Sequence, residues 1–185
     1  MDEVEAEGRS VGSGHFALWL MPSGTAHARL AQLIAELARE WSGHRFDPHV
    51  TLLGGITGET AKIVGQCEQL AASLRPFEIH LTEPGALDDY YRCLFLRVAH
   101  SPALIKTNAQ ARDIFHHHVD PAYLPHVSLL YGNHSVEVKR GIIALRVREI
   151  DLSFSVESLF LIDLAGEPQE WTIVRNFPFK KESNG

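Results

Sequence analysis

The chain has 185 residues, 45% of them hydrophobic and 22% charged, so it is long enough for one globular domain of moderate size or two small lobes that share a core. Its formal net charge of −6 leaves no basic surplus, which argues against a face for a long nucleic-acid duplex but allows one positive pocket for a small phosphorylated ligand. Its two cysteines, Cys67 and Cys93, define neither a disulfide framework nor a zinc motif, so we expect a reducing compartment and a cytoplasmic location.

Both ends of the chain are predicted to lie outside the folded domain. Residues 1–13 are acidic and rich in Gly and Ser, which indicates a disordered lead-in, and residues 180–185 are predicted to be a tail. The start lacks the basic and apolar segments of a signal peptide, and no apolar run is long enough to cross a bilayer. We therefore expect no membrane contact.

Apolar periodicity predicts an alternating order of strands and helices between these ends. Strands are predicted at residues 15–20, 49–53, 77–81, 92–98, 126–131, 152–162 and 171–177, with a glycine-rich turn after residue 53. Helices are predicted at residues 25–41, 59–74, 102–117 and 135–147.

The order strand, helix, strand, helix, strand occurs twice, roughly over residues 14–84 and 91–178, which indicates an internal duplication. Helices that come between strands cover the faces of sheets. We therefore predict an α+β fold in which residues 14–179 form a single bilobal domain. It has two pseudo-symmetric antiparallel sheets, outer helices and a groove between the lobes.

An eight-residue stretch supports the duplication. Residues 48–55, PHVTLLGG, return as residues 125–132, PHVSLLYG, with six identical letters and one exchange of a hydroxyl residue for another. Both copies occupy the same place in their half. Proline suits the first position of a strand, so each copy is predicted to begin one.

Each copy presents one imidazole and one hydroxyl on the same strand face. Side chains alternate across a strand, so His49 lies beside Thr51 and His126 beside Ser128, while the Val and Leu residues face the core. If the lobes bring these faces together, one neutral imidazole can take a proton from water and the other, protonated, can give one to a leaving oxygen. The two hydroxyls can donate hydrogen bonds to an anion between them. That set suits in-line displacement at phosphorus without a metal.

Packing in a core explains only some residues of the motif. Packing accounts for the proline, valine and leucine residues of both copies. It does not require a histidine and a hydroxyl on the outward face twice, so we favour a functional role.

The two motifs resemble the paired H-x-[T/S] motifs of the two-histidine phosphoesterase superfamily. The segments ALWLMP, RFDPHVTL, YRCLFLRV and YLPHVSLLYG are similar, in that order, to its cyclic phosphodiesterase branch, over about residues 15–178. The resemblance implies a bilobal fold and metal-free hydrolysis of 2′,3′-cyclic nucleotides to 2′-phosphates, or of ADP-ribose 1″,2″-cyclic phosphate to ADP-ribose 1″-phosphate.

The resemblance also assigns residues. It implies that His49 and His126 are the catalytic pair and that Thr51 and Ser128 bind the phosphate. It further implies that Trp19 and Tyr131 flank the nucleoside base, and together with those four they form the candidate site. By the same analogy His126 activates the water and His49 protonates the leaving oxygen, although the near-symmetric motif itself leaves the two roles open.

The residues themselves support the assignment of Tyr131 to the base, and they leave a structural alternative for Trp19. Tyr131 replaces Gly54 of the first copy, and an asymmetric ligand with a base on one side requires such a break in symmetry. Trp19 is equally compatible with a core aromatic on a strand. Tyr91 or Arg92, in the charged stretch before the second half, either touches the substrate or belongs to a surface turn.

Alternatives remain for the function and for a histidine run. The chain is also compatible with an enzyme of the same superfamily that acts on the 2′,3′-cyclic ends of RNA, or with a non-catalytic nucleotide-binding module. Residues 116–118 are all histidine, and consecutive positions splay around a helix, so a solvated helix end is favoured over a metal site. We expect a small cyclic phosphate nucleotide as the partner, with RNA 3′ ends as the alternative, and a monomer without metal or other cofactor.

Overall fold

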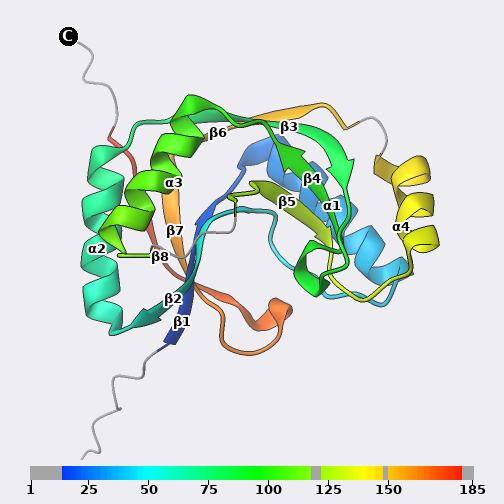
Figure 1. Ribbon diagram of the computed structural model, residues 1–185, viewed down its shortest axis with the longest axis horizontal. Coiled ribbons are helices and arrows are strands. Elements are labelled where there is room, and N and C mark those ends of the chain that lie inside the picture. Colours follow the sequence, from blue (N-terminus) through cyan, green and yellow to red (C-terminus); the bar gives the residue numbers. More distant parts are fainter. Residues whose placement is uncertain (1–13, 118–121, 148–149, 181–185) are drawn as a thin grey trace, which may run out of the picture.

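The computed structural model describes residues 14–117, 122–147 and 150–180, which form eight β-strands and four α-helices (Figure 1). The predicted α+β class is confirmed. The lead-in predicted for residues 1–13 lies outside the described residues, as does the predicted tail apart from Lys180.

All eight strands join in one strongly curled antiparallel sheet, in the order β6-β3-β4-β5-β2-β1-β7-β8 (Figure 1). The two sheets expected from the sequence are the halves of this sheet, joined where β2 pairs with β5 through Val50 and Val127. The strands are β1 (Gly14–Leu20), β2 (Val50–Gly58), β3 (Phe77–Gly85), β4 (Leu94–Val98), β5 (His126–Leu130), β6 (Leu152–Val156), β7 (Ser158–Asp163) and β8 (Thr172–Pro178).

The helices lie in two pairs, one on each half of the sheet (Figure 1). Helices α2 and α3 pack against each other and against β2, β7 and β8, while α1 packs against β5 and β6 and lies on the same side as α4. Helices α1 and α2 bury the apolar residues that their periodicity places on one face, which in α1 include Leu30, Ile34 and Leu37. The helices are α1 (Gly24–Glu40), α2 (Thr60–Ser73), α3 (Pro102–Ile114) and α4 (Val136–Ile142).

Each half of the sheet contains strands and helices from both halves of the sequence. Strand β3 follows α2 but pairs with β4, and β7 from the second half of the chain pairs with β1. The helices exchange as well, because α1 packs on β5 and α3 packs on β2. The exchange leaves the two motif strands, β2 and β5, as neighbours at the centre of the sheet.

The glycine-rich turn predicted after residue 53 is wrong, because β2 continues through Gly54 and Gly55. These two residues oppose the single residue Ala17 of β1, so the strand bulges there. Gly55 has a φ of 68°, a left-handed conformation that glycine adopts without a steric penalty. The glycines therefore bend a strand and do not end it.

The single strand predicted over residues 152–162 is also wrong, because it is divided into β6 and β7, which lie in opposite halves of the sheet. The buried positions change phase between them. Phe154 and Val156 are buried in β6, whereas Leu159 and Leu161 are buried in β7. A change from even to odd positions marks a strand that turns over, since side chains alternate strictly across a sheet.

Two helices end earlier than predicted. Helix α3 ends at Ile114, and α4 ends at Ile142, where a wider π-helical turn over Ile143–Val147 follows. The histidines at 116 and 117 therefore follow α3 and do not form its last turn, and His118 lies outside the described residues.

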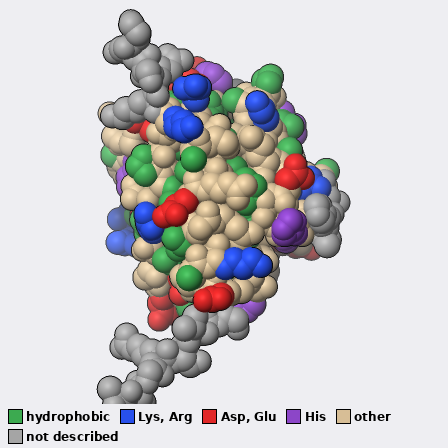
Figure 2. Space-filling model, turned by 90° about the vertical axis from the view of Figure 1, so that its left-hand side faces the viewer, with side chains coloured by type: hydrophobic (Ala, Val, Ile, Leu, Met, Phe, Trp, Pro, Cys, Tyr) green, Lys and Arg blue, Asp and Glu red, His purple; other side chains and the backbone are tan. Residues whose placement is uncertain are grey.

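The surface of the α2 and α3 side carries mixed charge. Lysines and arginines are interspersed there with acidic side chains and histidines, and they do not gather into one basic stripe (Figure 2). Among the described residues, no helix has the length and apolar character needed to cross a membrane.

Candidate active site

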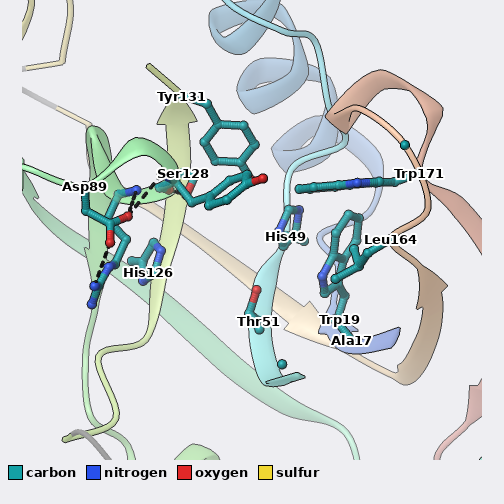
Figure 3. A pocket seen from close by; sticks show the side chains of 14 residues that line it. Ala17, Trp19, His49, Thr51, Asp89, His126, Ser128, Tyr131, Leu164 and Trp171 are labelled. Atoms are coloured by element: carbon teal, nitrogen blue, oxygen red, sulfur yellow. Dashed lines mark hydrogen bonds and ion pairs between the residues drawn. The ribbon is translucent and has the colours of Figure 1, made fainter. Parts of the chain in front are cut away.

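The two motif strands meet at one cavity of about 450 Å³. Its lining includes all six residues named from the sequence. Figure 3 shows His126 and Ser128 of β5 on one side, and Thr51 of β2 with His49, the residue just before β2, on the other. The six residues are Trp19, His49, Thr51, His126, Ser128 and Tyr131.

Each imidazole is oriented by the same local hydrogen bond. The Nδ1 atom of His49 lies 2.6 Å from the carbonyl oxygen of Asp47, and that of His126 lies 2.7 Å from the carbonyl oxygen of Leu124. A carbonyl oxygen only accepts, so each Nδ1 carries a hydrogen and donates it. Each Nε2 is then a lone-pair base when the ring is neutral and a donor when the ring is charged. The accepting carbonyl precedes the motif's proline in both copies, so the repeated sequence explains the repeated orientation.

Burial keeps both rings neutral in the free protein. It lowers the pKa of His49 to about 3, against a smaller upward effect of the hydrogen bond to Asp47, and the neighbouring His126 lowers this pKa further. Burial also lowers the pKa of His126, and the nearby charge of Arg92 acts in the same direction. An anion bound between the rings would favour their charged forms and raise both pKa values.

Trp19 forms a wall behind His49. The two rings are stacked with their centroids 3.4 Å apart and their planes inclined by 2°. Trp19 is only 4% exposed, so one of its faces is covered by the imidazole. The stack restricts rotation of His49 about its own side-chain bonds.

Tyr131 is equally buried on the opposite side of the cavity. Its ring stacks on Phe46, with centroids 3.9 Å apart. Burial raises the pKa of its phenol, although a hydrogen bond with Ser128 acts in the opposite direction. The phenol is therefore a neutral hydrogen-bonding group at any physiological pH.

The two motif hydroxyls differ in their partners. Ser128 Oγ donates to the backbone carbonyl of Tyr91 at 3.0 Å. Within the described part of the chain, the hydroxyl of Thr51 has no hydrogen-bond partner. Thr51 is thus free to donate to a ligand at once, whereas Ser128 must first give up a bond.

Asp89, Tyr91, Arg92 and Trp171 also line the cavity. The strand predicted from residue 92 begins two residues later, because Tyr90–Arg92 form a 3₁₀ turn, η1. Tyr91 is 53% exposed, so it offers more open ring surface than the two buried aromatics named from the sequence.

Trp171 comes from the loop between β7 and β8 and was missed by the sequence analysis. Its ring centroid lies 5.9 Å from that of Trp19, in an edge-on arrangement, and 6.1 Å from that of Tyr91. Its Nε1 atom is buried and has no hydrogen-bond partner among the described residues. No local pattern marks this residue, because only the pairing of β7 with β1 brings its loop to the motif.

No metal site is evident in the described residues, where no three His, Cys, Asp or Glu side chains are grouped so as to hold an ion.

Paired H-x-T/S strands that face one cavity define the two-histidine phosphoesterase arrangement. The chain belongs to the 2′-5′ RNA ligase superfamily, whose sequence profile matches residues 26–168. This match confirms the resemblance noted from the motifs. The chain is also 25% identical over 128 residues to the cyclic phosphodiesterase of Arabidopsis thaliana, in a match that covers 68% of this chain and 70% of the relative.

Solved structures share the fold at low sequence identity. Escherichia coli LigT, crystallised with 3′-AMP, superposes with a TM-score of 0.65 at 16% identity, covering 92% of this chain and all of LigT. The protein TT0787 of Thermus thermophilus superposes with a TM-score of 0.68 at 15% identity, covering 91% of this chain and all of TT0787. At these identities the likeness shows the fold alone.

Proposed function

We propose that the protein is a phosphodiesterase that opens small cyclic phosphates: nucleoside 2′,3′-cyclic phosphates to 2′-phosphates, ADP-ribose 1″,2″-cyclic phosphate to ADP-ribose 1″-phosphate, or both. The observation that carries the proposal is the pair of imidazoles at one cavity, each with Nδ1 bound to a backbone carbonyl. This leaves two Nε2 atoms for proton transfer. Such a pair supplies the base and the acid that hydrolysis of a phosphodiester needs.

The reaction balances without a further reactant. A water oxygen attacks phosphorus while one neutral Nε2 takes the water's proton. The bond from phosphorus to one ribose oxygen breaks, and the other, protonated Nε2 gives its proton to that oxygen. Thr51 and Ser128 donate hydrogen bonds to the non-bridging oxygens, where negative charge develops. The two rings end with exchanged protonation, which solvent restores.

The difference in burial bears on which ring begins protonated. His49 is 5% exposed and its pKa is lowered to about 3, while His126 is less buried. Burial therefore opposes the charged form of the ring less at His126 than at His49. This favours His126 as the acid and His49 as the base, the reverse of the assignment taken by analogy.

The aromatic side chains suit a nucleoside base. Trp19 and Tyr131 line the cavity but each already stacks on a neighbour, so they contribute edges and one face. Tyr91 and Trp171 add ring surface beside them. Stacking of a base on such rings contributes about 1–3 kcal/mol and tolerates any base.

The RNA-end alternative has weaker support. The acidic net charge and the mixed charges on the α2 and α3 side offer no track for a polynucleotide backbone there (Figure 2). The Arabidopsis relative of this chain is a cyclic phosphodiesterase, which supports a cyclic phosphate as the substrate.

Product analysis tests the proposal. The protein is incubated in excess chelator with 2′,3′-cyclic AMP and, separately, with ADP-ribose 1″,2″-cyclic phosphate, and the products are identified by phosphorus NMR. The expected products are the 2′-phosphate and the 1″-phosphate. Turnover only after addition of a divalent ion would refute the metal-free mechanism, and binding of both compounds without hydrolysis would favour the non-catalytic module.

The pH dependence of activity follows from the lowered pKa values. Active protein has one neutral and one charged ring, so kcat/KM is expected to be bell-shaped with its maximum below pH 6.5, the ordinary histidine value. The two limbs belong to the coupled pair. The kcat profile should lie at higher pH, because the bound anion raises both pKa values. Initial rates across pH 4 to 9 measure both curves, and a kcat profile that coincides with kcat/KM would contradict the electrostatic account.

A further inference from the structure

The cavity contains one permanent cation. Among the described residues that line it, Arg92 alone carries a fixed positive charge. The two imidazoles are neutral in the free protein, and the two hydroxyls are uncharged. Asp89, which also lines the cavity, carries the matching negative charge, so an anionic substrate meets an ion pair whose cationic member is Arg92.

Turn η1 holds Arg92 at the edge of the cavity. The carboxylate of Asp89 accepts from the backbone N–H groups of Tyr91 and Arg92, at 3.1 and 3.0 Å, and from Nη2 of Arg92 at 2.9 Å. Asp89 lies on the His126 side of the cavity (Figure 3). A guanidinium has five N–H donors, so the bond to Asp89 leaves donors for a second acceptor.

The rest of the protein anchors this turn. Lys139 on α4 is buried and donates from Nζ to the carbonyl of Leu87 at 2.8 Å, just before the turn. After β5, the N–H of Gly132 donates to the carbonyl of Tyr90 at 3.0 Å. Arg92 is thus presented by a fixed backbone.

We propose that Arg92, oriented by Asp89, binds an oxygen of the substrate's phosphoryl group and supplies the positive charge of the site. The proposal rests on the function proposed above. A planar guanidinium suits this task, because it can offer two parallel N–H groups to phosphate oxygens. Asp89 acts through Arg92 and is a positioning residue.

The contact would also couple binding to proton transfer. The charged groups that face His126 are Arg92 and Asp89 from η1 and Arg97 from β4, with His49 across the cavity. Arg92 and Arg97 lower the pKa of His126, and Asp89 raises it. A phosphoryl oxygen on Arg92 would offset its charge and so ease protonation of His126.

Arg97 provides a matched control. It acts on the same imidazole and removes the same charge when replaced, but it pairs with Glu83 at 3.5 Å and does not line the cavity. Arg92→Gln and Arg97→Gln therefore separate a contact with the ligand from a general field effect.

The test measures binding of inorganic phosphate by calorimetry and KM for 2′,3′-cyclic AMP in the full chain. Arg92→Gln is expected to weaken both by about tenfold to a hundredfold, the effect of losing a hydrogen bond to a charged group. Arg97→Gln should leave both within about twofold while moving the pKa of His126, read by NMR, upward as Arg92→Gln does. Arg92→Lys, which keeps the charge, should fall between wild type and Arg92→Gln.

Two outcomes overturn the inference: unchanged phosphate affinity in Arg92→Gln, or an equal loss in Arg97→Gln. Phosphate binding needs no turnover, so the inference and the proposed function fail separately. Affinity that depends on Arg92 in a protein that hydrolyses neither cyclic phosphate supports the inference and refutes the function. Hydrolysis by wild type together with full phosphate affinity in Arg92→Gln supports the function and refutes the inference.

Discussion

Replacement of His49 or His126 by alanine is expected to lower kcat for 2′,3′-cyclic AMP by about a hundred- to ten-thousand-fold, the usual contribution of a positioned acid or base. Each ring has its Nδ1 hydrogen committed to a backbone carbonyl, so its only remaining role at the cavity belongs to Nε2. The double replacement should cost little more than the worse single one, because both rings act in one transition state.

Steady-state kinetics and thermal unfolding check this expectation together. His49 is buried against Trp19, so its removal leaves a void, and unfolding must show that the variant remains folded at the assay temperature. His80 is the matched control, since it is an exposed histidine whose Nδ1 contacts Ser153 on the neighbouring strand. Turnover within tenfold of wild type in either single variant would contradict the acid–base assignment.

The same two variants can separate the acid from the base. A nitrophenyl phosphodiester has a leaving group that needs no proton, so loss of the acid should matter far less with it than with the cyclic nucleotide. If His126 is the acid, as its lesser burial favours, His126→Ala recovers on the activated ester and His49→Ala does not.

The hydroxyl prediction has the second largest expected effect. Thr51→Val and Ser128→Ala should each lower kcat by about a hundred- to a thousand-fold, the effect of losing one donor to a developing oxyanion. Thr51→Val keeps the shape of the side chain, so the decrease in kcat reports the removal of the hydroxyl alone.

The two hydroxyls should not be equivalent. Ser128 donates to the carbonyl of Tyr91 in the free protein, and turning toward the phosphate breaks that bond. Thr51 has no such competing acceptor among the described residues, so we expect Thr51→Val to be the more damaging change. Single-turnover rates measure the chemical step directly, and a larger loss in Ser128→Ala would contradict this reading of the hydrogen bonds.

The sequence was most informative where it repeated itself. The prolines, the alternation and the identical frames of the two motifs predicted two matching strands, and the structure places these side by side at the centre of the sheet. The helical stripes were equally clear, because an amphipathic period of 3.6 is a local property. Both signals depend only on neighbours along the chain.

The features that sequence reasoning missed depend on contacts between distant segments. Trp171 reaches the cavity because β7 crosses to the other half of the sheet and pairs with β1. The orientation of Arg92 depends on a carboxylate cap and a turn anchored by Lys139. The bulge at Gly54 and Gly55 has the composition of a turn, and only pairing with β1 makes it part of a strand.

The most direct test of the central claim is a crystal structure of the protein with a bound nucleoside 2′-monophosphate. We expect Nε2 of His49 and Nε2 of His126 each to lie about 2.6–3.2 Å from an oxygen of the same phosphoryl group, one on either side of phosphorus. A phosphoryl group that contacts only one of the two rings, or that lies outside the cavity, would contradict the account.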